Sequence, residues 1–433
     1  MTSQIKQRIE QINNGQVPEG YKKTEFGIFP SDWVTDKKLK DIGSFDKGRG
    51  LPGDKMRDSG VPCVGYGDIY MKYNNFHFEK AENFVDEDTA SESLPIEKGT
   101  LLFTGTGETA EEIGKCVCYN GDETIYAGGD IITFKTNEVN PLFLAYQQYQ
   151  SYSLARKASF GQGHSVVHIH ANNLEKLNVA YPKSTAEQEK IAEILMKWDK
   201  AIELYNQQIE KLTLLKSSCI KKMFPQKGEK VPEWRFKGFS NAWEQRKVSD
   251  LAEKTYGGGT PTTSNEAYWN GDIPWIQSSD VVDGKLLGVE PRKWITQDGL
   301  NNSAAQLIPG NSIAIITRVG VGKLAFMPYS YATSQDFLSL SKLNAEPLFT
   351  VYACYKKLQS ELNAVQGTSI KGITKDELLA KNIMVPRYAE QQQIGAFFKQ
   401  LDNLITLHQR KVEIIIKQRK ALQQYLLNGI VRV

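Results

Sequence analysis

The stretch that decides the fold runs from residue 182 to residue 224 and reads PKSTAEQEKIAEILMKWDKAIELYNQQIEKLTLLKSSCIKKMF. A second stretch, residues 386–427, reads PRYAEQQQIGAFFKQLDNLITLHQRKVEIIIKQRKALQQYLL and shares Ala-Glu-Gln at the same place. In both, apolar residues recur at alternating spacings of four and three, which predicts a long helix with a coiled-coil seam. One basic residue interrupts each seam at the same register, Lys216 in the first and Arg419 in the second, and His408 adds a further break.

The segments that precede these two helices also repeat, at a period of about 205 residues. Short apolar runs bounded by Gly, Pro and Asn predict that each segment is β-rich. One helix is expected in each segment, at residues 141–157 and at residues 347–362. The matched features are Trp33 with Trp243, residues 60–68 with residues 272–280, Gly99 with Gly310, and Gly163 with Gly367.

We therefore predict an α+β protein with two β-rich heads in tandem repeat, each followed by a long helix. The two helices bury their seams by pairing with each other as an antiparallel coiled coil. The predicted boundaries are an N-terminal arm at 1–22, a first head at 23–184, a central helix at 185–228, a second head at 229–387 and a C-terminal helix at 388–433.

This architecture favours a DNA-reading function. A seam of about 33 residues, at about 1.5 Å each, spans roughly 50 Å. DNA presents its major groove about every 34–36 Å, and two-headed proteins bind half-sites at that spacing or at a multiple of it. The helices of the two copies match better than the heads do. We therefore expect the heads to read different sequences, so that the whole site is asymmetric.

The composition limits the class of protein. The formal net charge of +3 over 433 residues does not by itself indicate a nucleic-acid partner. A basic stretch at residues 211–237 is concentrated around a domain boundary, although a solvated helix face and linker are the favoured explanation for it. There is no apolar run of membrane-spanning length and no signal-peptide pattern, so we expect no membrane partner. The five cysteines are scattered, which predicts reduced thiols in a cytoplasmic protein.

Several segments resemble the specificity subunits of type I restriction-modification systems. Residues 20–33, GYKKTEFGIFPSDW, resemble the segment that opens those subunits, and residues 231–243, VPEWRFKGFSNAW, resemble the start of their second head. Residues 257–280 resemble one common type of target-recognition domain, and residues 179–188 and 383–391 resemble head-to-helix junctions of the family. The resemblance covers nearly the whole chain, twice over and in the expected order.

The resemblance implies that each head is a target-recognition domain for one half of a bipartite site in double-stranded DNA. It implies that the paired helices dock two methyltransferase subunits, which bind S-adenosylmethionine and methylate adenine. Restriction and translocase subunits would use ATP and Mg to cut unmethylated DNA. The chain itself is then a non-catalytic specificity subunit that holds no cofactor.

A glycine-rich string at residues 103–107, FTGTG, resembles the cofactor loop of S-adenosylmethionine enzymes. The second copy reads ITRVGVG at residues 316–322, and the chain has no Pro-Pro dipeptide with which to hold a flipped adenine. A phosphate-binding Gly-Lys-Ser/Thr loop is also missing from the sequence. We therefore predict no catalytic residue and no ATP hydrolysis in this chain.

Three histidines, His164, His168 and His170, are close enough in sequence to suggest a metal cluster. The second copy has threonine or glycine at the corresponding places, so a metal would belong to one head only. Surface or packing roles, or contact with DNA by one or two of these histidines, are the favoured alternatives. We therefore predict no metal site.

Polar residues in glycine-rich loops, at matching places in the two heads, are the candidates for contact with DNA. Arg and Lys pair with guanine edges, Gln pairs with adenine, and Asp accepts from cytosine; ordinary turn chemistry is the alternative. The aromatic residues Tyr268, Trp269, Trp275 and Trp294 are interpreted as core rather than as base-stacking groups. The candidates are Lys47, Arg49, Tyr66, Asp68, Thr104, Thr106 and His164 in the first head, and Thr260, Thr262, Thr263, Gln277, Ser278, Ser279, Asp280, Thr317, Arg318, Lys323, Ser369 and Lys371 in the second.

Two other functions stay open at this point. A stand-alone DNA methyltransferase or nuclease is disfavoured because no paired site residues appear in both copies. A protein-binding scaffold that never contacts DNA is the second alternative. The salt dependence of binding separates the two classes, since complexes with DNA lose affinity steeply as salt rises.

Overall fold

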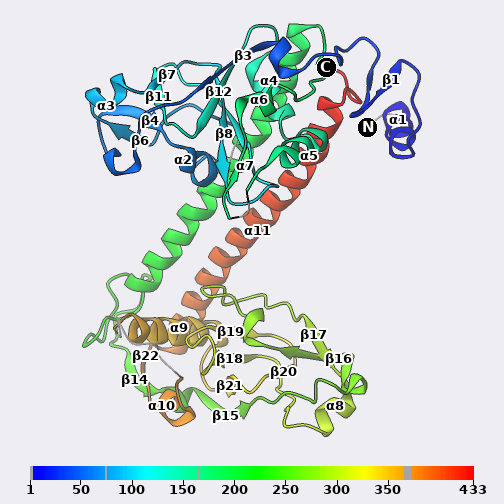
Figure 1. Ribbon diagram of the computed structural model, residues 1–433. Helices are drawn as coiled ribbons and strands as arrows, with labels where there is room; N and C mark the ends of the chain where they lie inside the picture. The colour runs from blue at the N-terminus through cyan, green and yellow to red at the C-terminus, as the bar shows by residue number, and fades with distance from the viewer. Residues whose placement is uncertain (1–2, 74–75, 164, 365–371) are drawn as a thin grey trace. The chain divides into compact units, whose positions relative to one another are not determined.

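The computed structural model describes residues 3–73, 76–163, 165–364 and 372–433 of the chain (Figure 1). The chain forms two compact units. Unit 1 comprises Met1–Leu204 and Val412–Val433, and unit 2 comprises Tyr205–Lys411. Each unit therefore contains one β-rich head together with a part of both long helices.

The two long helices are α7, Thr185–Lys222, and α11, Tyr388–Leu427. Within unit 1, the first half of α7 runs antiparallel to the end of α11, because Ile191 and Leu195 share a core with Leu426 and Leu427. Within unit 2, the end of α7 packs against the start of α11. Cys219 and Met223 share a core there with Ile394 and Phe398. The predicted antiparallel pairing of two long helices is confirmed within each unit.

The head of unit 1 is built around two main sheets, and β9 and β13 form a further two-stranded sheet. The larger has the order β3-β12-β8-β10-β5 and the smaller the order β6-β4-β11-β7. The core between the larger sheet and the helices includes Trp33, Phe134 and Phe143. The strands are β3 Gly43–Lys47, β4 Val61–Val64, β5 His77–Phe78, β6 Asn83–Val85, β7 Leu94–Ile96, β8 Leu101–Thr104, β9 Thr106–Gly107, β10 Cys116–Tyr119, β11 Ile125–Ala127, β12 Ile131–Thr136 and β13 Val167–His168, and the helices are α2 Tyr66–Met71, α3 Glu87–Ser91, α4 Pro141–Gln147, α5 Ser151–Phe160 and α6 Ala171–Leu174.

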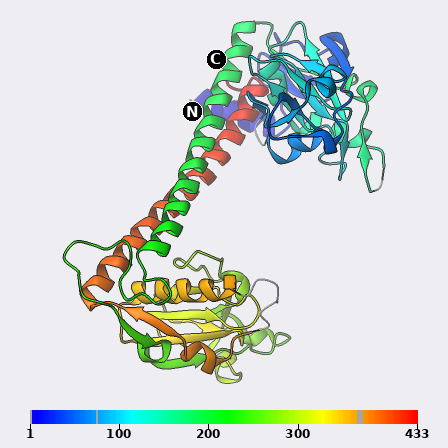
Figure 2. The ribbon, with the colours of Figure 1, turned by 90° about the vertical axis from the view of Figure 1, so that its left-hand side faces the viewer.

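The head of unit 2 repeats this plan with fewer strands. Its larger sheet has the order β15-β21-β18-β19, its smaller sheet the order β17-β16-β20, and a long helix, α9, covers the larger sheet (Figure 2). The strands are β14 Glu244–Lys247, β15 Ala252–Gly257, β16 Trp269–Ile276, β17 Lys293–Ile295, β18 Ser312–Ile316, β19 Leu324–Met327, β20 Ala332–Thr333, β21 Phe337–Leu343 and β22 Asn382–Val385, and the helices are α8 Gln297–Asn301, α9 Pro347–Ala364 and α10 Lys375–Leu379.

An N-terminal arm precedes the first head and belongs to unit 1. It consists of helix α1, Ser3–Asn13, and a hairpin of β1, Tyr21–Thr24, and β2, Gly27–Pro30. Arg8 donates a hydrogen bond to the Ile430 carbonyl at 2.7 Å, and the Tyr21 hydroxyl donates one to the Gly429 carbonyl at 2.6 Å. The arm is therefore fastened to the end of the chain.

The structure corrects two sequence expectations about the secondary structure and the strand register. The single helix expected at residues 141–157 is two helices, α4 and α5, separated by a turn in which Gln148 and Gln150 are buried. The strand register equates Leu101 with Ile313, so Gly99 corresponds to Asn311 rather than to Gly310. Gly99 and Asn311 both have positive φ, 85° and 57°, which is the conformation that Gly and Asn tolerate best.

Candidate nucleic-acid interface

Loops of the unit 1 head meet at one edge of its sheets. Gly48, directly after β3, donates its N–H to the Ile131 carbonyl at 2.8 Å. Gly105, directly after β8, donates to the Asp130 carbonyl at 2.8 Å, and Gly128 donates to the Val64 carbonyl at 3.1 Å. These bonds bring the loops after β3, β4, β8 and β11 together on one side of the head.

The unit 2 head builds the same edge with equivalent bonds. Gly259, after β15, donates to the Thr333 carbonyl at 2.8 Å. Thr317, after β18, donates to Asp336 at 2.8 Å, as Gly105 does to Asp130. The parallel strand pairs β4–β11 and β16–β20 are also equivalent. Cys63 lies opposite Tyr126 in the first pair, and Trp275 lies opposite Ala332 in the second. The repeat inferred from sequence therefore extends to individual hydrogen bonds.

Glycine is required where the first loop of each head crosses this edge. A Cβ atom on Gly48 would lie 1.9 Å from the Gly128 carbonyl oxygen. A Cβ atom on Gly258 would lie 1.8 Å from the Ser334 carbonyl oxygen. Both distances are far inside van der Waals contact, so any side chain would displace the loop. The glycine-rich character of these loops follows from close backbone packing.

Two of the candidate residues are carboxylates in the turns that follow β4 and β16. Asp68 and Asp280 are each 7% exposed. Asp68 accepts hydrogen bonds from the Gly65 N–H at 2.8 Å and from the Asn83 amide at 2.7 Å. Asp280 accepts from the Gln277 N–H at 3.0 Å and pairs with Arg292 at 3.4 Å. Each carboxylate thus closes the turn that leads out of β4 or β16.

Two candidate threonines are also buried. The Thr104 hydroxyl lies 2.8 Å from the Tyr70 hydroxyl and accepts from the Lys115 N–H at 3.0 Å. The Thr317 hydroxyl donates to the Asp336 carbonyl at 3.1 Å. These hydroxyls hold neighbouring loops together inside the head. The loop at residues 103–107 is likewise bonded within the head through Gly105.

The remaining described candidates reach the surface of the edge to different degrees. The side chains of Gln277, Ser278, Lys323 and Thr106 are half-buried, and Thr106 lies 3.3 Å from the His168 ring. Thr260 donates a hydrogen bond to Gln335 at 2.7 Å. His164, Ser369 and Lys371 lie outside the described residues. The exposed candidates are Lys47, Arg49 and Tyr66 in unit 1 and Thr260, Thr262, Thr263, Ser279 and Arg318 in unit 2.

The aromatic residues of the second head divide between core and surface. Trp275 is 4% exposed and donates its indole N–H to the Gly259 carbonyl at 3.0 Å. Trp269 packs edge-on against Trp275, with ring centroids 5.1 Å apart. Trp294 is 38% exposed, so the prediction that all four aromatics belong to the core is wrong for this residue. The Lys293 ammonium lies 5.6 Å from the Trp269 ring centroid.

The thiols of the chain are poorly suited to nucleophilic chemistry. All five cysteines are free and buried. Burial raises the pKa of Cys63 to about 11 and that of Cys116 to about 12. A thiol with such a pKa is almost entirely protonated near neutral pH and a weak nucleophile. Among the described residues, no group of three or more His, Cys, Asp or Glu is arranged to hold a metal ion.

In unit 1, a buried ion pair fastens the head to both long helices. The guanidinium of Arg419 on α11 contacts the Asp199 carboxylate on α7 at 2.9 and 3.2 Å. The hydroxyl of Tyr146, on α4, donates to the same carboxylate at 2.7 Å. Gln423, which accepts from Arg419, donates to the Tyr146 carbonyl at 3.1 Å. The basic interruption of the second seam is thus a specific clamp.

Unit 2 contains the matching clamp with the helices exchanged. Lys216, on α7, pairs with Asp402 on α11 at 2.5 Å. The hydroxyl of Tyr352, on α9, donates to Asp402, and Lys216 also donates to the Gly284 carbonyl at 2.9 Å. Lys216 and Arg419 therefore explain why both seams are broken at the same register. In each unit the cation comes from the long helix that follows the other head.

The shared Ala-Glu-Gln sequence builds the junction between each head and its helix. The Gln188 amide accepts from the Asn140 N–H at 2.6 Å and donates to the Pro182 carbonyl at 2.8 Å. The Gln391 amide accepts from the Glu346 N–H at 2.9 Å and donates to the Pro386 carbonyl at 2.8 Å. A side chain that both donates and accepts is needed here, which explains why both copies have glutamine.

Comparison with known proteins gives a family that agrees with this architecture. The model for the "Type I restriction modification DNA specificity domain" matches residues 30–214 and 241–417. The chain belongs to this family. The two matched regions together span most of the sequence and fall one in each copy of the repeat.

Relatives and solved structures agree with the family. A Methanocaldococcus jannaschii protein named for the MjaX type I restriction enzyme specificity subunit is 26% identical, over 96% of this chain and 97% of its own length. The EcoR124I/EcoR124II specificity subunit of Escherichia coli is 31% identical over 35% of this chain and 39% of its own length. The crystal structure of the S subunit of a type I restriction-modification system from M. genitalium has a TM-score of 0.62 at 14% identity, covering 91% of this chain and 96% of that one.

The family settles the class of this protein. It is the DNA specificity subunit of a type I restriction-modification system, and subunits of this family are not themselves catalytic. The predicted family, fold and non-catalytic role are therefore confirmed, and the stand-alone enzyme is not favoured. No described helix is long and apolar enough to cross a membrane.

Proposed function

We propose that this chain reads an asymmetric, two-part site in double-stranded DNA, with residues 23–184 and 229–387 as its two target-recognition domains. The observation that carries the proposal is the loop edge of each head. The two heads share its backbone hydrogen bonds, yet they present different side chains from it. A common scaffold with divergent loops suits two readers of different sequences.

The exposure of the proposed site residues supports two roles for them. The exposed Arg49 and Arg318 have the forked guanidinium that suits a guanine edge, and Lys47 suits a phosphate or guanine. The exposed threonines of the second head, Thr262 and Thr263, offer hydroxyl groups that donate or accept. The buried Asp68, Thr104, Asp280 and Thr317 act indirectly, because they hold the loops in position.

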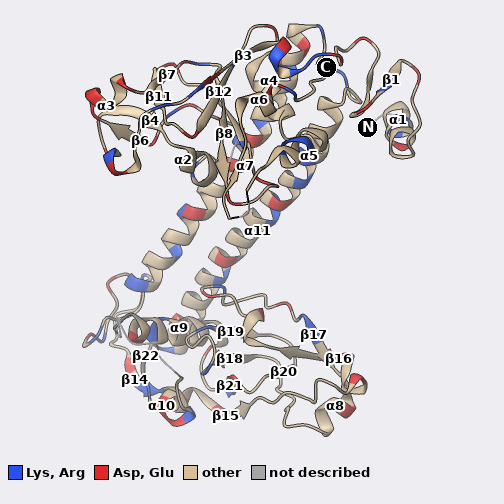
Figure 3. Ribbon diagram, viewed as in Figure 1, with Lys and Arg blue, Asp and Glu red and all other residues tan. Residues whose placement is uncertain are grey.

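The long helices are proposed to dock two methyltransferase subunits. Several large apolar residues on them are exposed, among them Leu214 at 68%, Leu407 at 61% and Ile414 at 57%. Lys, Arg, Asp and Glu are interspersed along the same helices (Figure 3). S-adenosylmethionine would bind to those partners, and ATP and Mg to restriction and translocase subunits. The cytoplasm, where DNA is accessible, is the proposed location. The length of the two helices is proposed to set the number of unread base pairs.

The proposal is tested by single-molecule methylation sequencing of a host that expresses this chain with its cognate methyltransferase subunits. The expected result is N6-methyladenine at a split, asymmetric motif that disappears when this chain is deleted. Assembly of the complex without any new methylated motif would contradict the proposal and favour a scaffold that never reads DNA. A chain whose residues 229–387 are replaced by another head should change one half of the motif only.

A further inference from the structure

The glutamate of each Ala-Glu-Gln sequence binds an arginine, but the two arginines differ in their second partner. In unit 1, the Arg432 guanidinium binds Glu187 through Nε at 2.5 Å and Nη2 at 2.8 Å. Its Nη1 and Nη2 atoms also donate to the two oxygens of Asp32, at 3.1 and 3.0 Å. The guanidinium is therefore shared between two carboxylates of the same chain.

In unit 2, the second carboxylate is missing. Arg235 binds Glu390 through Nε and Nη2, each at 2.7 Å, as Arg432 binds Glu187. Its Nη1 atom, the counterpart of the one that reaches Asp32, is buried without a hydrogen-bond partner among the described residues. The residue that precedes Trp243 is Ala242, whereas Asp32 precedes Trp33.

A second cation accompanies each arginine. Lys183 follows Pro182 at the first junction, and Arg387 follows Pro386 at the second. Hydrogen bonds from Arg432 lower the pKa of Asp32, and the charge of Lys183 adds to this effect. The negative charge of Asp32 therefore interacts with two cations in unit 1, Arg432 and Lys183. The exposed Arg387 forms no ion pair within the described part of the chain, and the Asn241 amide lies against its guanidinium.

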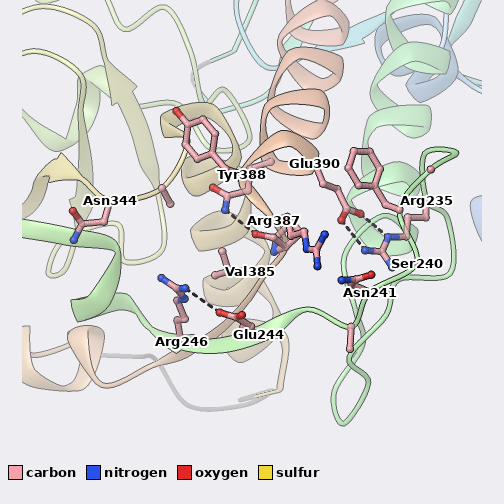
Figure 4. Close-up of a pocket in the computed structure, with 16 residues that line it drawn as sticks. Arg235, Ser240, Asn241, Glu244, Arg246, Asn344, Val385, Arg387, Tyr388 and Glu390 are labelled. Atoms are coloured by element: carbon pink, nitrogen blue, oxygen red, sulfur yellow. Dashed lines mark hydrogen bonds and ion pairs between the residues drawn. The ribbon is translucent and has the colours of Figure 1, made fainter.

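A cavity of about 430 Å³ within unit 2 is lined by Arg235, Asn241, Arg387 and Glu390, among others. Figure 4 shows the Arg387 side chain pointing toward Asn241 and Arg235. The remaining charged residues of the wall, Arg246 and Glu244, pair with each other at 2.9 Å. The cavity therefore holds one more cation than it holds carboxylates. Tyr388, 55% exposed, adds an apolar ring to its wall.

We propose that this junction pocket binds a carboxylate side chain of another polypeptide, which takes the place that Asp32 occupies in unit 1. A carboxylate matches the forked geometry of the two guanidinium groups. It also brings a single negative charge, which balances the one surplus cation. Phosphate, and DNA above all, brings more charge close to Glu390 and Glu244, so these carboxylates disfavour it. The pocket would add a point of attachment for a partner subunit, independent of sequence reading.

The pocket is tested on the full-length chain with N-acetylaspartate N-methylamide as the probe, followed through the side-chain NMR signals of 15N-labelled arginine. In the wild type, we expect the signals of Arg235 and Arg387 to move with the probe. Ala242→Asp should supply the missing carboxylate from the chain itself and weaken probe binding by about tenfold or more. Asp32→Ala should open the equivalent place in unit 1, so that the Arg432 signals move as well.

The controls separate carboxylate binding from other causes. The uncharged asparagine analogue of the probe should move none of these signals, and Ala242→Asn, which adds the same volume without the charge, should weaken binding of the aspartate probe less than Ala242→Asp does. The proposal is overturned if Ala242→Asp binds the probe as the wild type does, or if the wild-type signals do not move while those of Asp32→Ala do. Inorganic phosphate that binds more tightly than the aspartate probe would identify a phosphate site instead.

Discussion

The clamps of the two units have the same plan but different chemistry. Arg419 in unit 1 contacts Asp199 through two nitrogens and also reaches Gln423, and the pair is at most 8% exposed. Lys216 in unit 2 makes one contact with Asp402, whose side chain is 14% exposed, and one with a backbone carbonyl. The repeat therefore maintains a buried cation at this register, while the number of its partners varies. Such a pair specifies which helix surfaces meet, since a slipped register would bury a charge alone.

The largest effect is expected from removing these cations. Arg419→Met leaves the Asp199 carboxylate buried and unpaired, so the free energy of unfolding should fall by about 3–5 kcal/mol. Lys216→Met should cost less, because Asp402 is more exposed. Urea denaturation followed by circular dichroism measures both. Lys420→Met, an exposed neighbour on α11, is the matched control and should change stability by less than about 0.5 kcal/mol. Equal losses in all three variants would refute the clamp.

A second contrast concerns the loop edges of the heads. Arg49→Ala in unit 1 should weaken DNA binding by the assembled complex by about 1–3 kcal/mol and relax the first half-site only. Arg318→Ala should act in the same way on the second half-site only. Fluorescence anisotropy with DNA duplexes altered in one half at a time measures this. Lys135→Ala removes an exposed cation near the opposite end of β12 and should leave both half-sites unchanged. An Arg49→Ala effect spread over both halves would show that the heads do not read independently.

Exchanging the two cations sharpens the comparison of the clamps. Arg419→Lys loses the forked contact and the bond to Gln423, so we expect a loss of about 1–2 kcal/mol. Lys216→Arg must fit a larger group beside the Gly284 carbonyl, and a smaller change of either sign is expected. The same urea titration provides the readout. A loss for Arg419→Lys as large as that for Arg419→Met would mean that charge contributes little and that fork geometry dominates.

A dependence of stability on pH is also expected, and it differs between the units. Burial lowers the pKa of Lys157 in unit 1, and that of Lys356 in unit 2, from 10.5 to about 8. Since the folded state disfavours the protonated amine, each lysine lowers stability below pH 8, and this loss disappears as the pH rises from 8 to 10.5. Lys157→Met should flatten the rise in stability over that window. Lys356→Met should flatten it less, because Lys356 is only partly buried. Parallel curves for the wild type and Lys157→Met would contradict this assignment.

Sequence reasoning located the candidate DNA-contacting loops but not the roles within them. Asp68 and Asp280 match each other in sequence and look like base-reading carboxylates, yet both are buried as turn-closing groups. Their burial depends on strands that are distant in sequence, such as the one that brings Asn83 to Asp68. The one-residue error that matched Gly99 with Gly310 has the same origin. Hydrogen bonds between strands set the register, and a short segment met by itself does not contain them.

The sequence by itself determined the tandem repeat, the two long helices and the β-rich heads, because helical periodicity and internal similarity are local properties of the chain. It also marked Lys216 and Arg419 as exceptions within apolar seams. Only the tertiary structure decided what those exceptions do, since their partners Asp402 and Asp199 lie on the other long helix. The contrast between Asp32 and Ala242 likewise gained a meaning only when folding placed them beside Arg432 and near Arg235. Buried charges are paired across the fold, and such pairs are invisible to any pattern read along the chain.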